Sequence, residues 1–268
     1  MLDTLSTYAF PPTGIACYYH TASVRNALDI LECSHLFGSL PSKVNDPGDL
    51  KISIVNLDES PLLQSRAAGL DRKAIQKRVS AALADKTIMD RTYRFVCLAD
   101  ADKVDADSQS ELRFWNDYAN HFKGVRFKFI VDKEFLLTPS SNNAFVGMMD
   151  YMGCAATIDA VNVNDISDIK QLIDQDQFLK DLCYSKSEEW KSEYELRIGS
   201  TYSRLKLDMS KITSKEERFF CFRPESIIEV SVGYDANKID IGELQLMLQA
   251  RNIPLSVAKV NLQYDKLR

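Results

Sequence analysis

The chain has 268 residues, of which 45% are hydrophobic and 26% are charged, and its formal net charge at pH 7 is −5. This length and balance are typical of one globular domain, so we expect a single domain over residues 1–268. We do not expect an acidic chain to bind duplex DNA independently of the DNA sequence, because a dedicated DNA-binding protein is normally basic.

Targeting signals and cysteine spacing narrow the class of protein further. No apolar run approaches the roughly 20 residues of a membrane-spanning helix, and residues 1–12 lack the cationic start and apolar core of a signal peptide. The six cysteines include no C-x-x-C pair, which argues against a zinc ribbon or a disulfide scaffold. Most of them lie among apolar neighbours and are interpreted as small core residues. We therefore expect a cytoplasmic protein with no membrane partner.

The first elements predicted along the chain are a strand and a helix. Residues 15–20, IACYYH, form a short apolar run that is typical of a strand ending at His20. Ser23 then caps a helix whose apolar residues recur at helical spacing. A turn is predicted at 45–48 and a helix at about 71–85. The outer face of that helix carries the densest basic patch of the chain: Arg72, Lys73, Lys77 and Arg78.

The rest of the chain is rich in short strand patterns. Strands are predicted at 92–100, 124–132, 194–200, 218–223, 226–234 and 254–262, and helices at about 110–122, 166–184 and 240–252. The strands gather at both ends of the sequence without a regular alternation with helices. This order favours an α+β fold over a doubly wound parallel sheet.

A stripe of charged residues marks the strand predicted at 194–200. In a strand, Glu193, Glu195 and Arg197 point to one face, and the residues between them point to the other. Such a stripe can hold a substrate hydroxyl and stabilise developing positive charge. The alternative is a solvated sheet face with paired charges, and the stripe alone favours that alternative. The stripe places Glu195 beside another acid, Glu193, and neighbouring like charges repel each other. Replacement of Glu195 is therefore expected to change the stability of the fold little.

Two further places combine histidine with neighbours that suit a binding site. In the helix predicted at 110–122, Tyr118 and His121 lie on the shoulder of an apolar stripe that contains Trp115, although a core helix is the default interpretation. His20 and Thr21 precede a helix N-terminus, whose amides favour anions such as phosphates. The alternative there is a histidine that only bonds the backbone. The three histidines lack paired metal-ligand spacing, so a metal site is not favoured.

Five motifs in a fixed order give a family resemblance. They are YYHTAS at 18–23, VNDPGD at 44–49, WNDYANHFKGVRFKF at 115–129, KSEEWKSEYELRI at 186–198 and FRPESIIEVSVGYDA at 222–236. Their order and spacing resemble the prokaryotic domain-of-unknown-function family 2971 over residues 15 to 250. The chain departs from that pattern at Val44, where the family usually has phenylalanine, and at Gly48, where an aromatic residue is common.

That family in turn resembles a distant branch of the ADP-ribosyltransferase superfamily. The resemblance implies a split antiparallel β-sheet core with flanking helices, with His20 on the first strand and Glu195 as the catalytic glutamate. Glu193 supplies the E-x-E spacing of some of these enzymes, and Tyr118 or Trp115 would pack against nicotinamide. The same resemblance implies NAD⁺ as the donor substrate, with no metal.

The resemblance also assigns further roles and partners. His20 and Thr21 would position the nucleotide, and Arg197 or His121 would meet the pyrophosphate. The acceptor would be a macromolecule in a toxin or phage-defence setting, with an antitoxin as a possible protein partner. A nucleic acid is slightly favoured over a protein because of the basic face at 72–78.

Two alternatives to this function stay open at the level of sequence. One is a metal-assisted hydrolase or nuclease that uses Asp46, His121, Glu193 and Glu195. The other is a non-catalytic binding module.

Overall fold

A computed structural model describes residues 3–44, 49–50, 52–55, 93–137, 144–151, 156–159, 181–201 and 219–258. The predicted turn at 45–48, which includes Asp46, and the basic helix at 71–85 lie outside these residues. So does most of the helix predicted at 166–184. The expected preference for a nucleic acid therefore stays a prediction from sequence.

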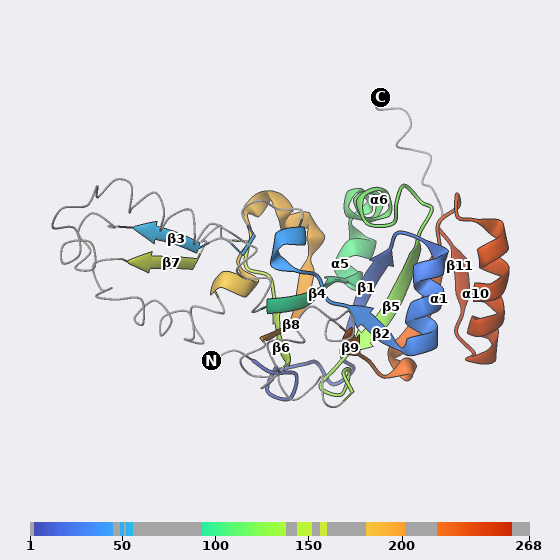
Figure 1. The fold of residues 1–268 in the computed structure, drawn as a ribbon, viewed down its shortest axis with the longest axis horizontal. Helices are drawn as coiled ribbons and strands as arrows, with labels where there is room; N and C mark the ends of the chain where they lie inside the picture. The colour runs from blue at the N-terminus through green and yellow to red at the C-terminus, as the bar shows by residue number, and fades with distance from the viewer. Residues whose placement is uncertain are drawn as a thin grey trace, which may run out of the picture.

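A seven-stranded, mostly antiparallel sheet forms the centre of the protein, with the strand order β11-β10-β5-β1-β4-β8-β6 (Figure 1). Its strands are β1 (Ile15–Thr21), β4 (Tyr93–Asp100), β5 (Val125–Val131), β6 (Ala144–Met148), β8 (Glu195–Thr201), β10 (Ile227–Val232) and β11 (Leu255–Val257). Only the β10–β11 pair among these neighbours is parallel. The α+β class predicted from sequence is confirmed.

Two small sheets and several helices complete the described elements. The two-stranded sheets pair β2 (His35–Phe37) with β9 (Phe219–Cys221), antiparallel, and β3 (Ile52–Val55) with β7 (Ala156–Asp159), parallel. The helices are α1 (Val24–Cys33), α5 (Ala101–Ala106), α6 (Ser108–Asp117) and α10 (Lys238–Ala250), with short 3-10 turns η1 (Pro41–Lys43), η5 (Glu188–Glu193) and η8 (Pro224–Ser226). Among the described helices, none combines the length and the hydropathy that a membrane crossing requires.

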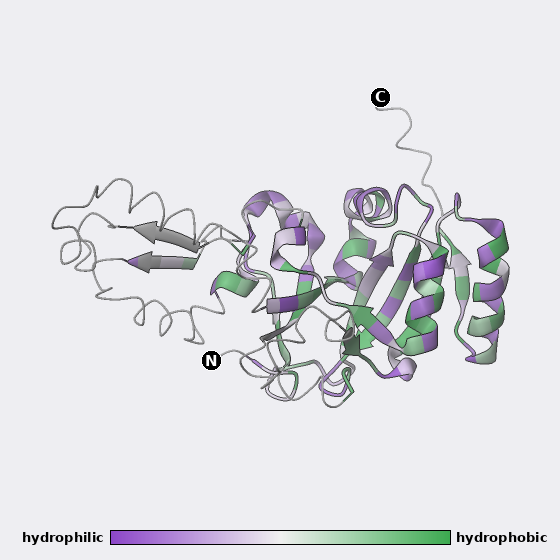
Figure 2. Cartoon of the chain, viewed as in Figure 1, coloured by the Kyte–Doolittle hydropathy of each residue, from purple (hydrophilic) through white to green (hydrophobic). Residues whose placement is uncertain are grey.

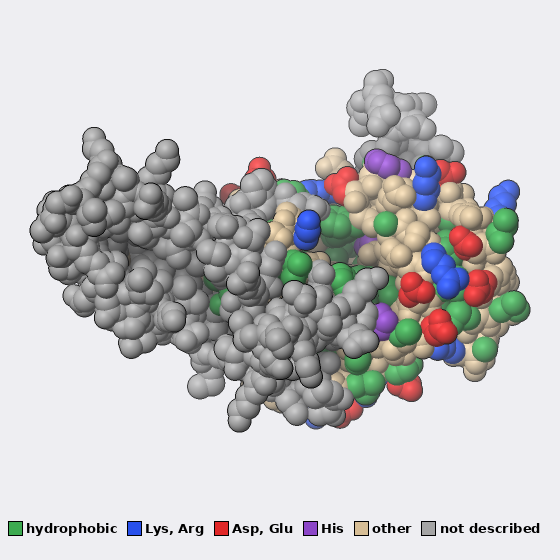
Figure 3. Space-filling model, viewed as in Figure 1, with side chains coloured by type: hydrophobic (Ala, Val, Ile, Leu, Met, Phe, Trp, Pro, Cys, Tyr) green, Lys and Arg blue, Asp and Glu red, His purple; other side chains and the backbone are tan. Residues whose placement is uncertain are grey.

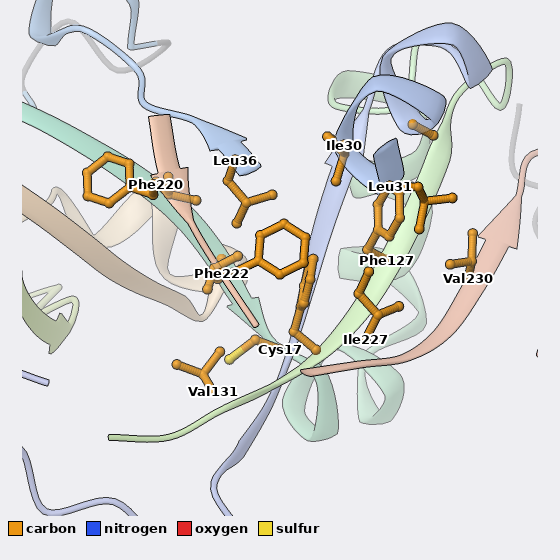
Figure 4. Close-up of a cluster of buried hydrophobic side chains, with 14 of the residues drawn as sticks. Cys17, Ile30, Leu31, Leu36, Phe127, Val131, Phe220, Phe222, Ile227 and Val230 are labelled. Carbon is orange, nitrogen blue, oxygen red and sulfur yellow. The ribbon is translucent and has the colours of Figure 1, made fainter. Parts of the chain in front are cut away.

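The main hydrophobic core lies between the sheet and the helices α1 and α10. Leu31 of α1 packs over Phe127 of β5, close to Val230 of β10 (Figure 4). Leu248 of α10 belongs to the same buried cluster. Both helices show alternating hydrophobic and hydrophilic bands, as helices with one buried face do (Figure 2). Ser23 caps α1 by accepting a hydrogen bond from the amide of Asn26, which confirms the predicted start of the helix.

The opposite face of the sheet carries α5 and α6. Tyr18 of β1 belongs to a second buried cluster with Ala101 of α5 and Phe114 of α6. Because side chains alternate along a strand, this arrangement turns Tyr18 and His20 toward α6, while Cys17 points into the main core. Figure 3 shows basic and acidic side chains interspersed over the coloured surface in that view.

The sheet is divided at the contact between β1 and β4. β1 pairs with β5 along its whole length, from Ile15 to Thr21, and β4 pairs with β8 from Tyr93 to Ala99. β1 and β4 themselves share only the pairs Cys17–Asp100 and Tyr18–Ala99. Beyond Tyr18 the two strands are not paired, so the end of β1 that carries His20 separates from β4.

The predicted boundaries differ from the structure at two turns that shape the site. α6 ends at Asp117, whereas the prediction continued to 122, because Asn120, His121 and Phe122 adopt left-handed backbone angles. The amide of Phe122 bonds the carbonyl of Trp115, so the turn satisfies a carbonyl that the end of the helix leaves free. β8 begins at Glu195 because Tyr194 also has a left-handed backbone, with φ of 46°.

Gly124 fixes how closely the turn after α6 approaches the end of β1. A Cβ atom at Gly124 would lie 1.8 Å from the carbonyl oxygen of Thr21, whereas one at Gly242 in α10 would meet nothing within 4 Å. We predict that Gly124→Ala lowers the free energy of unfolding by about 1–3 kcal/mol through overpacking. Gly242→Ala should raise it by about 0.5–1 kcal/mol, because alanine favours a helix interior. Urea unfolding measures both changes, and equal effects at the two positions would contradict the close approach.

Candidate active site

A cavity of about 320 Å³ opens where β1 and β4 separate, and residues of β1, β4, β8 and α6 line it. One wall is largely aromatic and contains Tyr18, His20 and Phe114. The other wall contains the charged side chains of Glu195 and Arg197. The cavity lining therefore combines aromatic rings with a group of buried charges.

Arg197 is the centre of the charged wall and has no exposed surface. Its Nε donates to Glu195 Oε1 at 2.7 Å. Its two terminal nitrogens donate to the carboxylate of Asp49 at 3.0 and 2.7 Å, and one of them also donates to the carbonyl of Cys183 at 2.9 Å. The guanidinium carbon lies 4.4 Å from the centre of the Phe95 ring. These contacts satisfy the guanidinium on several sides and fix its plane.

Lys186 provides the second buried cation. Its Nζ donates to Glu193 Oε2 at 2.5 Å and to Glu195 Oε2 at 3.2 Å. The hydroxyl of Tyr118 donates to the other oxygen of Glu193. The Trp190 ring lies 4.9 Å from the Lys186 ammonium. Each cation of the wall therefore bonds Glu195 through a different oxygen of its carboxylate.

These neighbours determine the charge of Glu195. Burial by itself would raise its pKa, but the Arg197 guanidinium and the Lys186 ammonium outweigh burial and lower the pKa to about 2. Burial would lower the pKa of Lys186, and Glu195 and Glu193 reverse that effect and raise it. At neutral pH Glu195 is an anion and Lys186 is a cation.

His20 presents a different kind of group on the aromatic wall. Its ring stacks on Phe114 with the centroids 5.1 Å apart, and it meets Trp115 edge-on at 5.7 Å. Burial, followed by the charge of Arg126, lowers the pKa of His20 well below its ordinary value. Its Nε2 is buried and has no hydrogen-bond partner among the described residues. The His20 ring itself lines the cavity.

The structure brings five of the predicted site residues together: His20, Tyr118, Glu193, Glu195 and Arg197 all line the cavity. The interpretation of the charged stripe as a solvated sheet face is wrong, since Glu195 is 3% exposed and Arg197 is 0% exposed. Glu193 lies in η5 instead of the strand. Its side chain still joins the stripe, because it shares the Lys186 ammonium with Glu195.

Three other predicted residues lie outside the cavity lining. Trp115 is buried and reaches the site only through its contact with His20. The hydroxyl of Thr21 donates to the carbonyl of Ser23 at 2.8 Å. His121 is exposed, in the turn after α6. The position of His121 does not support the predicted contact with a pyrophosphate. The predicted contact of Arg197 with a pyrophosphate also lacks support, because its buried guanidinium is paired with the carboxylates of Asp49 and Glu195.

Sequence reasoning missed three residues of the site. Asp49 and Lys186 were inside the quoted motifs, as the last residue of VNDPGD and the first of KSEEWKSEYELRI, but no charge pattern assigned them a partner. Cys97 faces Arg197 across the β4–β8 pair and lines the cavity instead of the core. Burial and the nearby Glu195 raise its pKa, so it remains a thiol.

The metal-dependent alternative gains no support from the described residues. Among them, no group of three or more His, Cys, Asp and Glu side chains is arranged to hold a metal ion. The position between Glu193 and Glu195 is taken by the Lys186 ammonium, and His121 is not in the cavity lining.

The paired cations reverse the expectation that Glu195 contributes little to stability. The folded pKa of about 2 lies below the ordinary 4.5, so the contribution of the anion is present above about pH 4.5 and is lost as the pH falls toward 2. We predict that Glu195→Gln lowers the free energy of unfolding at pH 7 by about 3–5 kcal/mol. The substitution removes an anion that two buried cations share.

Urea unfolding measured in steps from pH 7 to pH 2 tests this. The difference in the free energy of unfolding between wild type and Glu195→Gln should decrease as the pH falls, because Glu195 becomes protonated in the wild-type protein. Exposed Glu189 in η5 provides the matched control, and Glu189→Gln should follow the wild-type curve. Parallel wild-type and Glu195→Gln curves would mean that Glu195 does not hold the charge described above.

Comparisons of the chain with protein-family models, with curated proteins and with solved structures found no match.

Proposed function

We propose that the protein is an NAD⁺-dependent ADP-ribosyltransferase whose transition state is stabilised by Glu195. The observation that carries the proposal is a carboxylate bonded by two buried cations in the lining of a cavity that aromatic rings also line. A group with a pKa of about 2 is a poor proton donor or acceptor at neutral pH, but it is a fixed negative charge. The site thus suits a reaction in which positive charge develops.

Cleavage of the nicotinamide–ribose bond is such a reaction. The bond between ribose C1′ and the nicotinamide nitrogen breaks, and the electron pair leaves with neutral nicotinamide. The ribose then passes through an oxocarbenium-like state, as in glycoside hydrolysis. A nucleophilic oxygen or nitrogen of the acceptor, or water, bonds to C1′ and releases its proton to solvent. Glu195 would stabilise the positive ribose electrostatically, without becoming protonated.

The described contacts leave room for this role. A carboxylate has about four acceptor positions. The described hydrogen bonds use two of them, for Arg197 and Lys186. The carboxylate therefore has acceptor capacity left for a ribose hydroxyl. Lys186 and Arg197 would act as positioning residues, because they hold the carboxylate and are themselves buried.

The size and the balance of charge also suit the nicotinamide riboside half of NAD⁺. A cavity of about 320 Å³ is at the small end of ligand sites, so it would hold this half and leave the adenosine outside. Phe114 and Tyr118 would contact the nicotinamide ring. His20 would help to position the carboxamide or the ribose, because its ring lines the same cavity. The carboxylates of Asp49, Glu193 and Glu195 are balanced by the cations of Lys186, Arg197 and Arg113, which lies 3.8 Å from Glu193, so this cluster has no excess positive charge to repel a cationic ring.

The separation of β1 from β4 supports the finer assignment of the fold. A sheet that opens between the strand carrying His20 and the strands leading to Glu195 matches the expected split antiparallel core. On this basis we keep the proposals of an ADP-ribosyltransferase-like fold and of membership in family 2971. The proposed acceptor is a cytoplasmic macromolecule, with a nucleic acid favoured by the basic residues at 72–78. A toxin or phage-defence role, with an antitoxin partner, belongs to the same proposal.

Loss of the charge at Glu195 should remove most of the activity. We predict that Glu195→Gln lowers the rate of nicotinamide release from NAD⁺ by about 10²–10³, the scale for loss of one electrostatic stabiliser. NAD⁺ affinity should change less, because the ground state carries less charge at the ribose than the transition state. The rate is measured by chromatography, on protein shown by circular dichroism to be folded at the assay temperature.

Two controls separate this prediction from loss of folding or of a metal. Glu189→Gln should turn over NAD⁺ like wild type, and EDTA should leave the wild-type rate unchanged. A folded Glu195→Gln variant with wild-type turnover would refute the proposed function. Activity that EDTA abolishes and Mg²⁺ restores would favour the metal-dependent alternative.

His20 should affect binding more than chemistry. We predict that His20→Ala raises the KM for NAD⁺ about three- to tenfold with little change in kcat, as expected for a residue that positions the substrate. His121→Ala is the matched control and should resemble wild type, because its side chain is exposed and outside the cavity lining. Steady-state kinetics of the three proteins provides the comparison. A raised KM in the His121 variant alone would instead place the pyrophosphate at the turn after α6.

A further inference from the structure

One cation of the candidate active site remains without an anion when the charges around the cavity are paired. Apart from His20, the lining contains three basic side chains: Lys43, Lys186 and Arg197. Lys186 and Arg197 are buried and bond carboxylates of the site. Lys43 is exposed and has no ion pair with any residue that the structure describes. Its charge therefore faces solvent at the edge of the cavity.

The acids of the cavity lining already have other cationic partners. Four acids line it: Asp49, Asp117, Glu193 and Glu195. Arg197 bonds the first and the last of these, and Lys186 bonds both glutamates. Arg113 lies 3.4 Å from Asp117 and 3.8 Å from Glu193. No acid of the lining is left for Lys43, so its ammonium group is available to an anionic part of a ligand.

Backbone contacts hold Lys43 beside the cavity. Ser39, just before η1, exchanges two backbone hydrogen bonds with Phe95 of β4, at 2.7 and 3.3 Å. The amide of Lys43 donates to the carbonyl of Leu40 at 2.9 Å, and Pro41 of the same turn is buried. The backbone that carries Lys43 is thus attached to a strand that lines the cavity, while Lys43 itself is exposed.

The size of the cavity places a phosphate of the proposed substrate near this lysine. A volume of about 320 Å³ suits the nicotinamide riboside half of NAD⁺, and the first phosphate is attached to the 5′ carbon of that ribose. The phosphate would therefore lie where the cavity opens to solvent. Of the two residues expected from sequence to meet it, Arg197 is paired with carboxylates and His121 lies outside the lining.

We propose that Lys43 binds the phosphate attached to the nicotinamide riboside and thereby selects phosphorylated ligands over the free nucleoside. Its Nζ would donate a charge-assisted hydrogen bond to a phosphate oxygen. Lys43 would determine specificity without taking part in the chemistry, because the phosphate is remote from the bond that breaks. The inference rests on the proposed function, which supplies the orientation of the ligand in the cavity.

Nicotinamide mononucleotide and nicotinamide riboside are matched probes, because they differ only in this phosphate. Ligand-detected NMR at low ionic strength measures the Kd of each and shows any nicotinamide that is released. The wild-type protein is expected to bind the mononucleotide about fivefold more tightly, the upper end for an ion pair at an exposed position. Lys43→Ala should remove this preference by weakening the binding of the mononucleotide alone, and Lys43→Arg should keep it.

Lys123→Ala is the matched control. Lys123 is exposed, lies outside the cavity lining and has no ion pair among the described residues. This variant should bind both probes like wild type. Loss of the preference in Lys123→Ala but not in Lys43→Ala would overturn the assignment and place the phosphate at the turn after α6.

The remaining outcomes keep this inference separate from the proposed function. Equal wild-type affinity for the two probes, equal weakening of both by Lys43→Ala, or no binding of either probe would overturn the phosphate site. The proposed function is tested independently, by release of nicotinamide from NAD⁺. A preference that depends on Lys43 in a protein that does not turn over NAD⁺ would support the phosphate site and count against the transferase.

Discussion

The pairing of Arg197 with Glu195 and Asp49 is the interaction on which the candidate site depends. A guanidinium with no exposed surface is tolerated only when carboxylates and carbonyls replace its water. Here the partners come from the same strand and from a segment 148 residues earlier in the sequence. The charge that stabilises Arg197 is also the charge that the proposed chemistry uses. Folding and the proposed function would therefore depend on the same buried ion pair.

The limited pairing of β1 with β4 gives this ion pair a cavity to face. If the two strands were paired along their whole length, the end of β1 would lie against β4 and would fill the space in front of Glu195. The structure pairs them only at Cys17 and Tyr18. The far end of β1 is held instead by β5, and there His20 stacks on Phe114. The same departure from regular sheet pairing thus separates the aromatic wall from the charged wall.

The segment that carries Lys186 is held by backbone hydrogen bonds to Asp150. The amide of Asp150 donates to the carbonyl of Tyr184, and the amide of Lys186 donates to the carbonyl of Asp150. These bonds fix the backbone from which the Lys186 ammonium reaches Glu195.

Local pattern in the sequence predicted α1 and every strand of the central sheet except β6, and it indicated which side chains share a face. Alternation along 194–200 placed Glu195 and Arg197 together, and Ser23 marked the start of α1, because both depend on near neighbours. The burial of that face, the partnership with Asp49 and the approach of Lys186 were decided by tertiary structure. They depend on contacts between distant segments, and a charged stripe has the same pattern whether water or another strand covers it. The end of α6 was also decided in three dimensions, because the chain leaves the helix at Asp117 to enter β5 beside β1.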